Sequence, residues 1–176
     1  MTDRKECPPH RRARVSTRTG LAAAFLATLL AANFVAGAQD HGAPPIDDAI
    51  FARKALKDAA CDRMADIERM IGLGRIDLDD VHTKADAIAA MLTAFPHLFP
   101  PGSNLWKPDI DQDPATATLA SPDLWVTFPD FYRQATAAAK TAFELSRADT
   151  IDDAKTRARE LRIACDACHA LYLEEQ

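Results

Sequence analysis

The sequence has little of what builds a β-sheet or a disulfide-stapled fold. Aromatic residues make up 7% of its 176 residues, glycines number only 6, and no long run of alternating β-branched residues suggests a strand. Its 4 cysteines include Cys7, which lies within the first 38 residues, and the odd number of three that remain disfavours a disulfide framework. Alanine, by contrast, is abundant. The composition therefore favours one all-helical domain.

The first 38 residues have the layout of a targeting segment. A basic head precedes an uncharged apolar stretch from Leu21 to Val35, and residues 36–38 offer the small-x-small pattern of a signal-peptidase site. The apolar stretch falls short of the ~20 residues that a membrane span needs. We therefore expect residues 1–38 to be a cleaved signal peptide and residues 39–176 to be the mature domain of an exported protein; the alternative is a retained membrane anchor.

Removal of the signal peptide changes the charge balance. The chain has 21 basic and 26 acidic residues; 6 basic and 2 acidic ones precede residue 39, which leaves 15 against 24 and a mature net charge of −9. A negatively charged surface repels the phosphates of nucleic acid and so disfavours it as a partner. It favours proteins with basic patches, with binding that weakens as the salt concentration rises.

Four stretches of the mature chain repeat apolar residues at helical spacing. They cover approximately residues 46–71, 79–95, 128–148 and 151–172. Proline and glycine clusters separate them, and the long connection 96–121 is rich in Pro and Asp. Four amphipathic helices of this length predict an all-α fold, an antiparallel four-helix bundle. Because many inward positions are alanine, we expect a thin core with room for a large flat cofactor.

The run Cys165-Asp166-Ala167-Cys168-His169 carries the most specific chemistry in the chain. Cys-x-x-Cys-His is the motif by which a c-type haem is attached to protein. On a helix the two cysteines and the histidine share one face, so the sulfurs can anchor the ring while the imidazole reaches the iron. We therefore predict one covalently bound haem c, attached at Cys165 and Cys168, with His169 as an axial ligand of the iron.

Two other interpretations of the cysteine pair are available. A zinc site would need further ligands, and the sequence has no second Cys-x-x-Cys and no histidine pair at metal spacing. A thioredoxin-like redox pair would follow a strand at the start of a helix, whereas this pair lies near the end of the last predicted helix. The predicted signal peptide is also consistent with a haem protein, because bacterial c-type haem is attached outside the cytoplasm. We therefore expect the protein in the periplasm.

Beyond this motif the sequence resembles the cytochrome c′ family of class II c-type cytochromes. The likeness extends over most of residues 39–176 and includes Phe-Pro-Pro-Gly-Ser at 99–103, Pro-Asp-Leu-Trp at 122–125 and Tyr172 after the haem histidine. The resemblance implies an up-down-up-down bundle with the haem near the C-terminal helix, and pairing into a homodimer. Nothing in the sequence resembles a substrate pocket with acid–base groups, so the first expectation is an electron carrier and not an enzyme.

The resemblance also implies roles for residues of the first helix. It implies that Arg53 pairs with a haem propionate, the alternative being a surface charge. It places the residue over the open face of the iron one turn later, at Leu56 or Lys57. In the family, an apolar residue there leaves the iron five-coordinate and able to bind nitric oxide or carbon monoxide, whereas a methionine makes an electron carrier. A gas-binding protein that sequesters or senses its ligand is therefore the alternative function.

Overall fold

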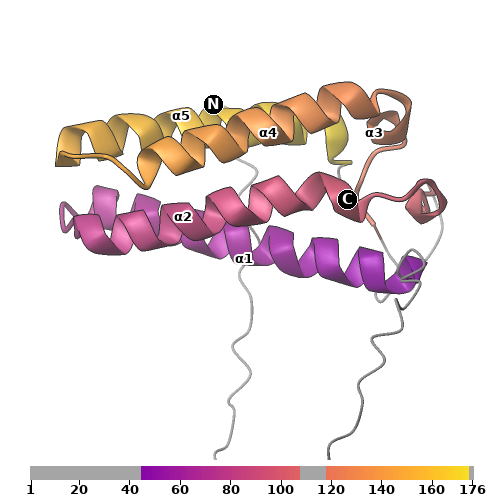
Figure 1. The fold of residues 1–176 in the computed structure, drawn as a ribbon, viewed down its shortest axis with the longest axis horizontal. Coiled ribbons are helices and arrows are strands. Elements are labelled where there is room, and N and C mark those ends of the chain that lie inside the picture. The colour runs from indigo at the N-terminus through magenta and orange to yellow at the C-terminus, as the bar shows by residue number, and fades with distance from the viewer. Residues whose placement is uncertain (1–44, 108–117, 175–176) are drawn as a thin grey trace, which may run out of the picture. The chain divides into compact units, whose positions relative to one another are not determined.

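The computed structural model describes residues 45–107 and 118–174. In this part four long helices run side by side: α1 (Ile46–Gly72), α2 (Leu78–Ala94), α4 (Phe128–Leu145) and α5 (Ile151–Tyr172) (Figure 1). The connection between α2 and α4 contains two 3-10 helices, η1 (Phe95–Leu98) and η2 (Pro101–Ser103), and the one-turn helix α3 (Asp123–Val126). The predicted all-α bundle is confirmed; the predicted signal peptide lies outside the described residues.

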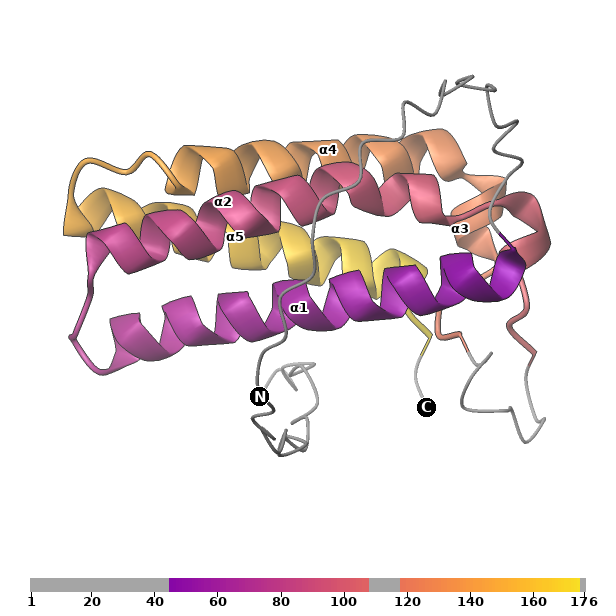
Figure 2. The same ribbon diagram turned by 60° about the horizontal axis from the view of Figure 1, so that its bottom comes forward.

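Successive long helices run in opposite directions. The turn between α1 and α2 lies at the same end of the bundle as the turn between α4 and α5, and the crossover from α2 to α4 lies at the other end (Figure 1 and Figure 2). This is the up-down-up-down order that the resemblance implied. Helix α2 packs against α1 and α4, and α4 packs against α5, whereas α1 and α5 touch at few points.

The helix ends follow local signals in the sequence. The side chain of Asp77 accepts backbone N–H bonds from the first turn of α2, and that of Thr150 does the same for α5. Such caps satisfy donors that have no partner within the helix. Gly74, with φ of 65°, turns the chain from α1 toward α2 in a conformation that favours glycine.

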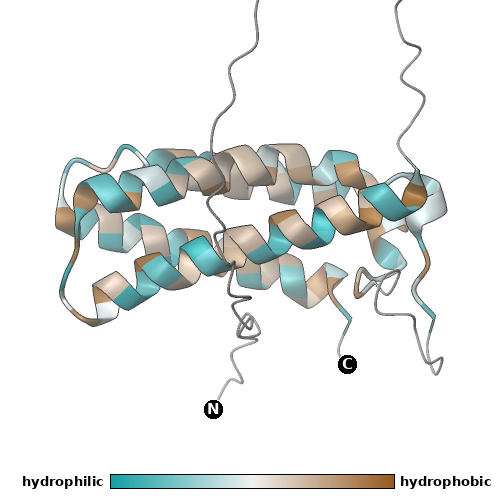
Figure 3. Cartoon of the chain, turned by 90° about the horizontal axis from the view of Figure 1, so that it is seen from below, coloured by the Kyte–Doolittle hydropathy of each residue, from teal (hydrophilic) through white to brown (hydrophobic). Residues whose placement is uncertain are grey.

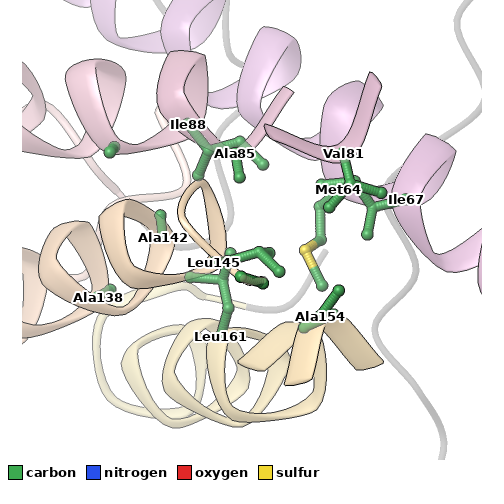
Figure 4. Packing of buried hydrophobic residues seen from close by; sticks show 13 residues of the cluster. Met64, Ile67, Val81, Ala85, Ile88, Ala138, Ala142, Leu145, Ala154 and Leu161 are labelled. Carbon is green, nitrogen blue, oxygen red and sulfur yellow. The ribbon is translucent and has the colours of Figure 1, made fainter. Parts of the chain in front are cut away.

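Two clusters of buried side chains hold the bundle together. The larger draws on all four long helices, and in Figure 4 its side chains point toward one another: Met64, Ile67, Val81, Ala85, Ile88, Ala138, Ala142, Leu145, Ala154 and Leu161. The smaller is mostly aromatic and lies at the crossover end: Phe99, Leu124, Phe131 and Tyr172. The ring of Phe131 lies edge-on to those of Phe99 and Tyr172, with centroids 5.0 and 5.4 Å apart.

Hydrophilic and hydrophobic residues alternate around the long helices (Figure 3), as expected for helices that bury one face and expose the other. Among the residues described, no helix combines the length and the apolar character that crossing a membrane requires.

Candidate functional site

Two adjoining cavities run along the seam where α1 and α5 touch at few points. The small cavity, of about 100 Å³, has mainly apolar walls that include Leu56, Ala60, Met64, Leu92 and Ala135. The large cavity, of about 350 Å³, is bordered by residues that include Arg53, Lys54, Thr118, Leu124 and Tyr172. Five residues line both cavities: Lys57, Phe95, Phe131, Cys168 and His169. Apolar walls with a few polar groups are typical of cofactor sites.

The predicted haem motif lies on α5 and faces these cavities. Cys165 lines the small cavity, and Cys168 and His169 line both. All three side chains are partly buried, whereas Asp166 and Ala167 between them are exposed. The helix therefore presents the three residues on one face, as their spacing predicts.

Burial makes both thiols of the motif weaker acids than a solvent-exposed cysteine. Desolvation raises the pKa of Cys168 to about 11. It also raises the pKa of Cys165, against the opposing effect of the nearby Arg162 charge. Metal ions bind the thiolate and not the thiol, whereas a thioether sulfur carries no charge that burial would disfavour. The surroundings therefore suit covalent attachment of an apolar group better than a thiolate-bound ion.

Arg53 is a buried cation at the edge of the large cavity, with a side chain only 3% exposed. Its Nη1 donates to Ser103 Oγ at 2.9 Å, and its Nη2 donates to the Ser103 carbonyl oxygen at 3.2 Å and to Thr118 Oγ1 at 2.8 Å. The guanidinium also lies against the rings of Phe99 and Trp125, 4.9 and 5.7 Å from their centroids. These contacts fix the direction of the side chain.

The charge of Arg53 has no carboxylate partner within residues 45–107 and 118–174. Burial lowers its pKa to about 10, because desolvation disfavours the charged form. Three hydrogen bonds use three of the five guanidinium N–H groups, which leaves two donors. A buried cation of this kind, oriented at a cavity and with donors to spare, suits an anionic group such as a haem propionate.

The two candidates for the open face of the iron differ in position. Leu56 lines the small cavity alone, whereas Lys57 lines both cavities. The Nζ of Lys57 lies 3.0 Å from Asp58 Oδ1, and its side chain is 33% exposed. Met64, two turns further along α1, also borders the small cavity but is 3% exposed and belongs to the larger core cluster.

A bidentate ion pair bridges the seam beside the small cavity. Arg162 on α5 donates from Nε to Glu68 Oε1 at 2.7 Å and from Nη2 to Glu68 Oε2 at 2.8 Å. The hydrogen bond to Glu68 raises the pKa of Arg162 despite partial burial. The pair ties α1 to α5 one turn from Cys165, at a place where the two helices share few other contacts.

Several of these contacts were not predicted from the sequence. Ser103 lies in the segment 99–103 that the resemblance singled out, but no pattern pointed to Thr118 as a partner of Arg53. The ion pair of Glu68 with Arg162 joins residues 94 positions apart, and nothing in either local sequence marks it. The described residues contain no group of three or more His, Cys, Asp or Glu side chains arranged to hold a metal ion.

Comparison with known proteins points to one family. The family model described as cytochrome c′ matches residues 48–172. Cytochrome c′ from Thermochromatium tepidum is similar in structure, with a TM-score of 0.66, 23% identity, and coverage of 74% of this chain and 98% of that one. Cytochrome c prime from Shewanella frigidimarina has a TM-score of 0.65 and 22% identity, and covers 76% and 100% of the two chains. No curated protein matches the sequence.

The raised thiol pKa values predict slow alkylation of the motif in protein made without haem attachment. A pKa of about 11 in place of 9.0 lowers the thiolate fraction of Cys168 about a hundredfold near neutral pH. Iodoacetamide labelling, followed peptide by peptide across pH, should therefore show the Cys168 midpoint above that of the denatured chain. Equal midpoints in the folded and denatured chains would show that burial does not govern this thiol.

Proposed function

The chain belongs to the cytochrome c′ family of c-type haem proteins, and we propose that it is a mono-haem cytochrome that transfers electrons. The observation that carries the proposal is the meeting of Cys165, Cys168 and His169 at two adjoining cavities. The cysteines would hold the ring through their sulfurs, and His169 would be an axial ligand. When bound, haem supplies an iron that accepts and releases one electron.

The residues present fit such a group. Alanines line part of the small cavity and leave space that a flat ring would fill. At the large cavity, the buried Arg53 guanidinium would bind a propionate with its two remaining donors. The apolar ring of a haem would therefore contact the apolar walls of the small cavity, and its anionic propionate would contact Arg53 at the large cavity. This match supports the assignment of both cavities to a single haem.

Electron transfer is supported by the position of the motif on α5. Cys165, Cys168 and His169 are only partly buried, so a ring attached to them would lie near the surface, where a partner can approach. A mature net charge of −9 favours partners with basic patches. The pattern of residues 1–38 supports export by a cleaved signal peptide, and the proposed location is therefore the bacterial periplasm.

Gas binding is the second candidate function. The specific observation in its favour is the small cavity, whose mainly apolar walls include Leu56 and which His169 also borders. An uncharged ligand such as nitric oxide or carbon monoxide needs no polar partner in such a space. The sixth ligand of the iron decides between this function and electron transfer by a six-coordinate haem.

We also propose a homodimer, with a contact on α1. One structurally similar protein, at a TM-score of 0.64 and 22% identity, is a cytochrome c′ described as having an unusual ligand-controlled dimer dissociation. In the present chain Phe51 on α1 is 73% exposed, and Ala55, one turn further along, is exposed too.

Phe51→Asp should therefore shift the species seen in sedimentation velocity from dimer to monomer, whereas Val126→Asp, at a 79% exposed site outside α1, should not. A wild-type protein that sediments as a monomer would contradict the proposal.

The central test is an absorption spectrum of the mature protein made with haem-maturation machinery. We expect one haem that stays with the chain under denaturing chromatography, and its loss in the double variant Cys165→Ala/Cys168→Ala. A reduced protein that is low-spin and indifferent to carbon monoxide indicates a sixth protein ligand and electron transfer. A high-spin spectrum that shifts with carbon monoxide indicates an open iron and favours gas binding. A wild-type chain without covalent haem would refute the assignment.

The Arg53 assignment predicts a change in reduction potential. Arg53→Leu removes a buried positive charge near the proposed propionate, which stabilises the ferric state and should lower the potential by something on the order of tens of millivolts. Arg133→Leu is the matched control, because Arg133 is 73% exposed and pairs with Asp130; salt and solvent screen such a charge. Equal shifts in the two variants would show that Arg53 acts through net charge alone.

A further inference from the structure

We propose that Lys57 gives this site a preference for small anions at the iron, through hydrogen bonds from its ammonium group. The inference rests on the proposed haem attachment at Cys165, Cys168 and His169 and deepens it by naming a ligand class. Nitric oxide and carbon monoxide are neutral, so apolar cavity walls suffice for them. Azide and fluoride carry a full negative charge, which is costly to bury unless the walls supply a positive charge or N–H donors.

Lys57 stands where the two cavities meet. It borders both of them from α1, and His169 borders both from α5. Leu56, the alternative on the same helix, borders the small cavity alone. The other shared residues are Phe95, Phe131 and Cys168, whose side chains offer no cation. Of the residues at this junction, Lys57 is therefore the one with an ammonium group, on the wall opposite the group that His169 would hold.

The charges on the cavity walls all have the same sign. Arg53 and Lys54 border the large cavity, Arg162 borders the small one and Lys57 borders both; within the described residues no Asp or Glu borders either. This excess of cations contrasts with a chain whose overall net charge is −5. Where the surroundings are poorly polarisable, such an arrangement attracts anions more strongly than the same charges would in water.

The two arginines among these cations are each held by more than one hydrogen bond. Arg162 forms its bidentate pair with Glu68, and Arg53 is held by Ser103 and Thr118 at the place proposed for a propionate. Lys57 pairs with Asp58 through one short contact of 3.0 Å. An ammonium group has three N–H donors and, while protonated, no lone pair with which to bind iron. Lys57 therefore has donors left for an anion in the cavity.

The test compares anion affinities of the ferric holo-protein by titration with azide and fluoride. Replacing a charge-assisted hydrogen bond by an apolar contact in Lys57→Leu should weaken both by about ten- to hundredfold. Lys57→Arg should keep most of the affinity. Lys140→Leu is the matched control, because it removes the same charge from a side chain that is 77% exposed and borders neither cavity, and it should leave both affinities unchanged.

A second measurement separates a direct bond from a general effect of charge. The iron–fluoride stretching frequency in resonance Raman spectra should rise in Lys57→Leu, because a hydrogen bond to fluoride weakens its bond to iron. Carbon monoxide affinity of the ferrous protein should change much less than azide affinity, because the ligand is neutral.

Unchanged azide and fluoride affinities in a folded Lys57→Leu protein would overturn the proposal. So would a low-spin ferric wild-type spectrum that turns high-spin in Lys57→Leu, because Lys57 would then itself occupy the iron. Failure of the proposed function is seen separately, as a wild-type chain that retains no haem under denaturing chromatography.

Discussion

The sparse contact between α1 and α5 is the constraint on which the rest of this structure depends. A four-helix bundle gains its stability by filling the space between neighbouring helices, and side chains that face a void lose their packing partners. Here alanines such as Ala60 and Ala164 line the small cavity, so the seam stays open. The Glu68–Arg162 ion pair ties one part of the seam, and the Arg53 contacts organise the crossover end. Between them remains a space suited to an apolar ring with an anionic edge.

The electrostatics of this space oppose those of the protein as a whole. A buried cation is costly unless it is hydrogen-bonded and paired. Arg53 has the hydrogen bonds and two aromatic neighbours, but no carboxylate within the described residues. Its low pKa, about 10, reflects this incomplete compensation. An anionic group that arrives beside it relieves a cost already present in the fold, which is a physical reason for a cavity to hold its cofactor in one orientation.

Sequence reasoning located the parts of this arrangement that are local. The bounds of α1 and α5 and the shared face of Cys165 to His169 follow from a period of 3.6 residues and from signals within a few positions, whereas a role for Arg53 at the cavity came from the family resemblance. The partners of Arg53 and Arg162 did not follow, because they come from distant segments. Nor could the sequence choose between Leu56 and Lys57, since one residue turns a helix by about 100° and a small error in register exchanges the two.

The position of Lys57 connects the two candidate functions. A cation near the iron favours the ferrous state, whereas a bound anion neutralises that cation and favours the ferric state. Because coupling between two equilibria is reciprocal, an anion that binds the ferric form more tightly lowers the reduction potential by the same free energy. A site of this composition therefore does not separate electron transfer from ligand binding. With a haem held at this junction, the tendency to release an electron would depend on whether the cavities hold an anion, and Lys57 would set the strength of that dependence.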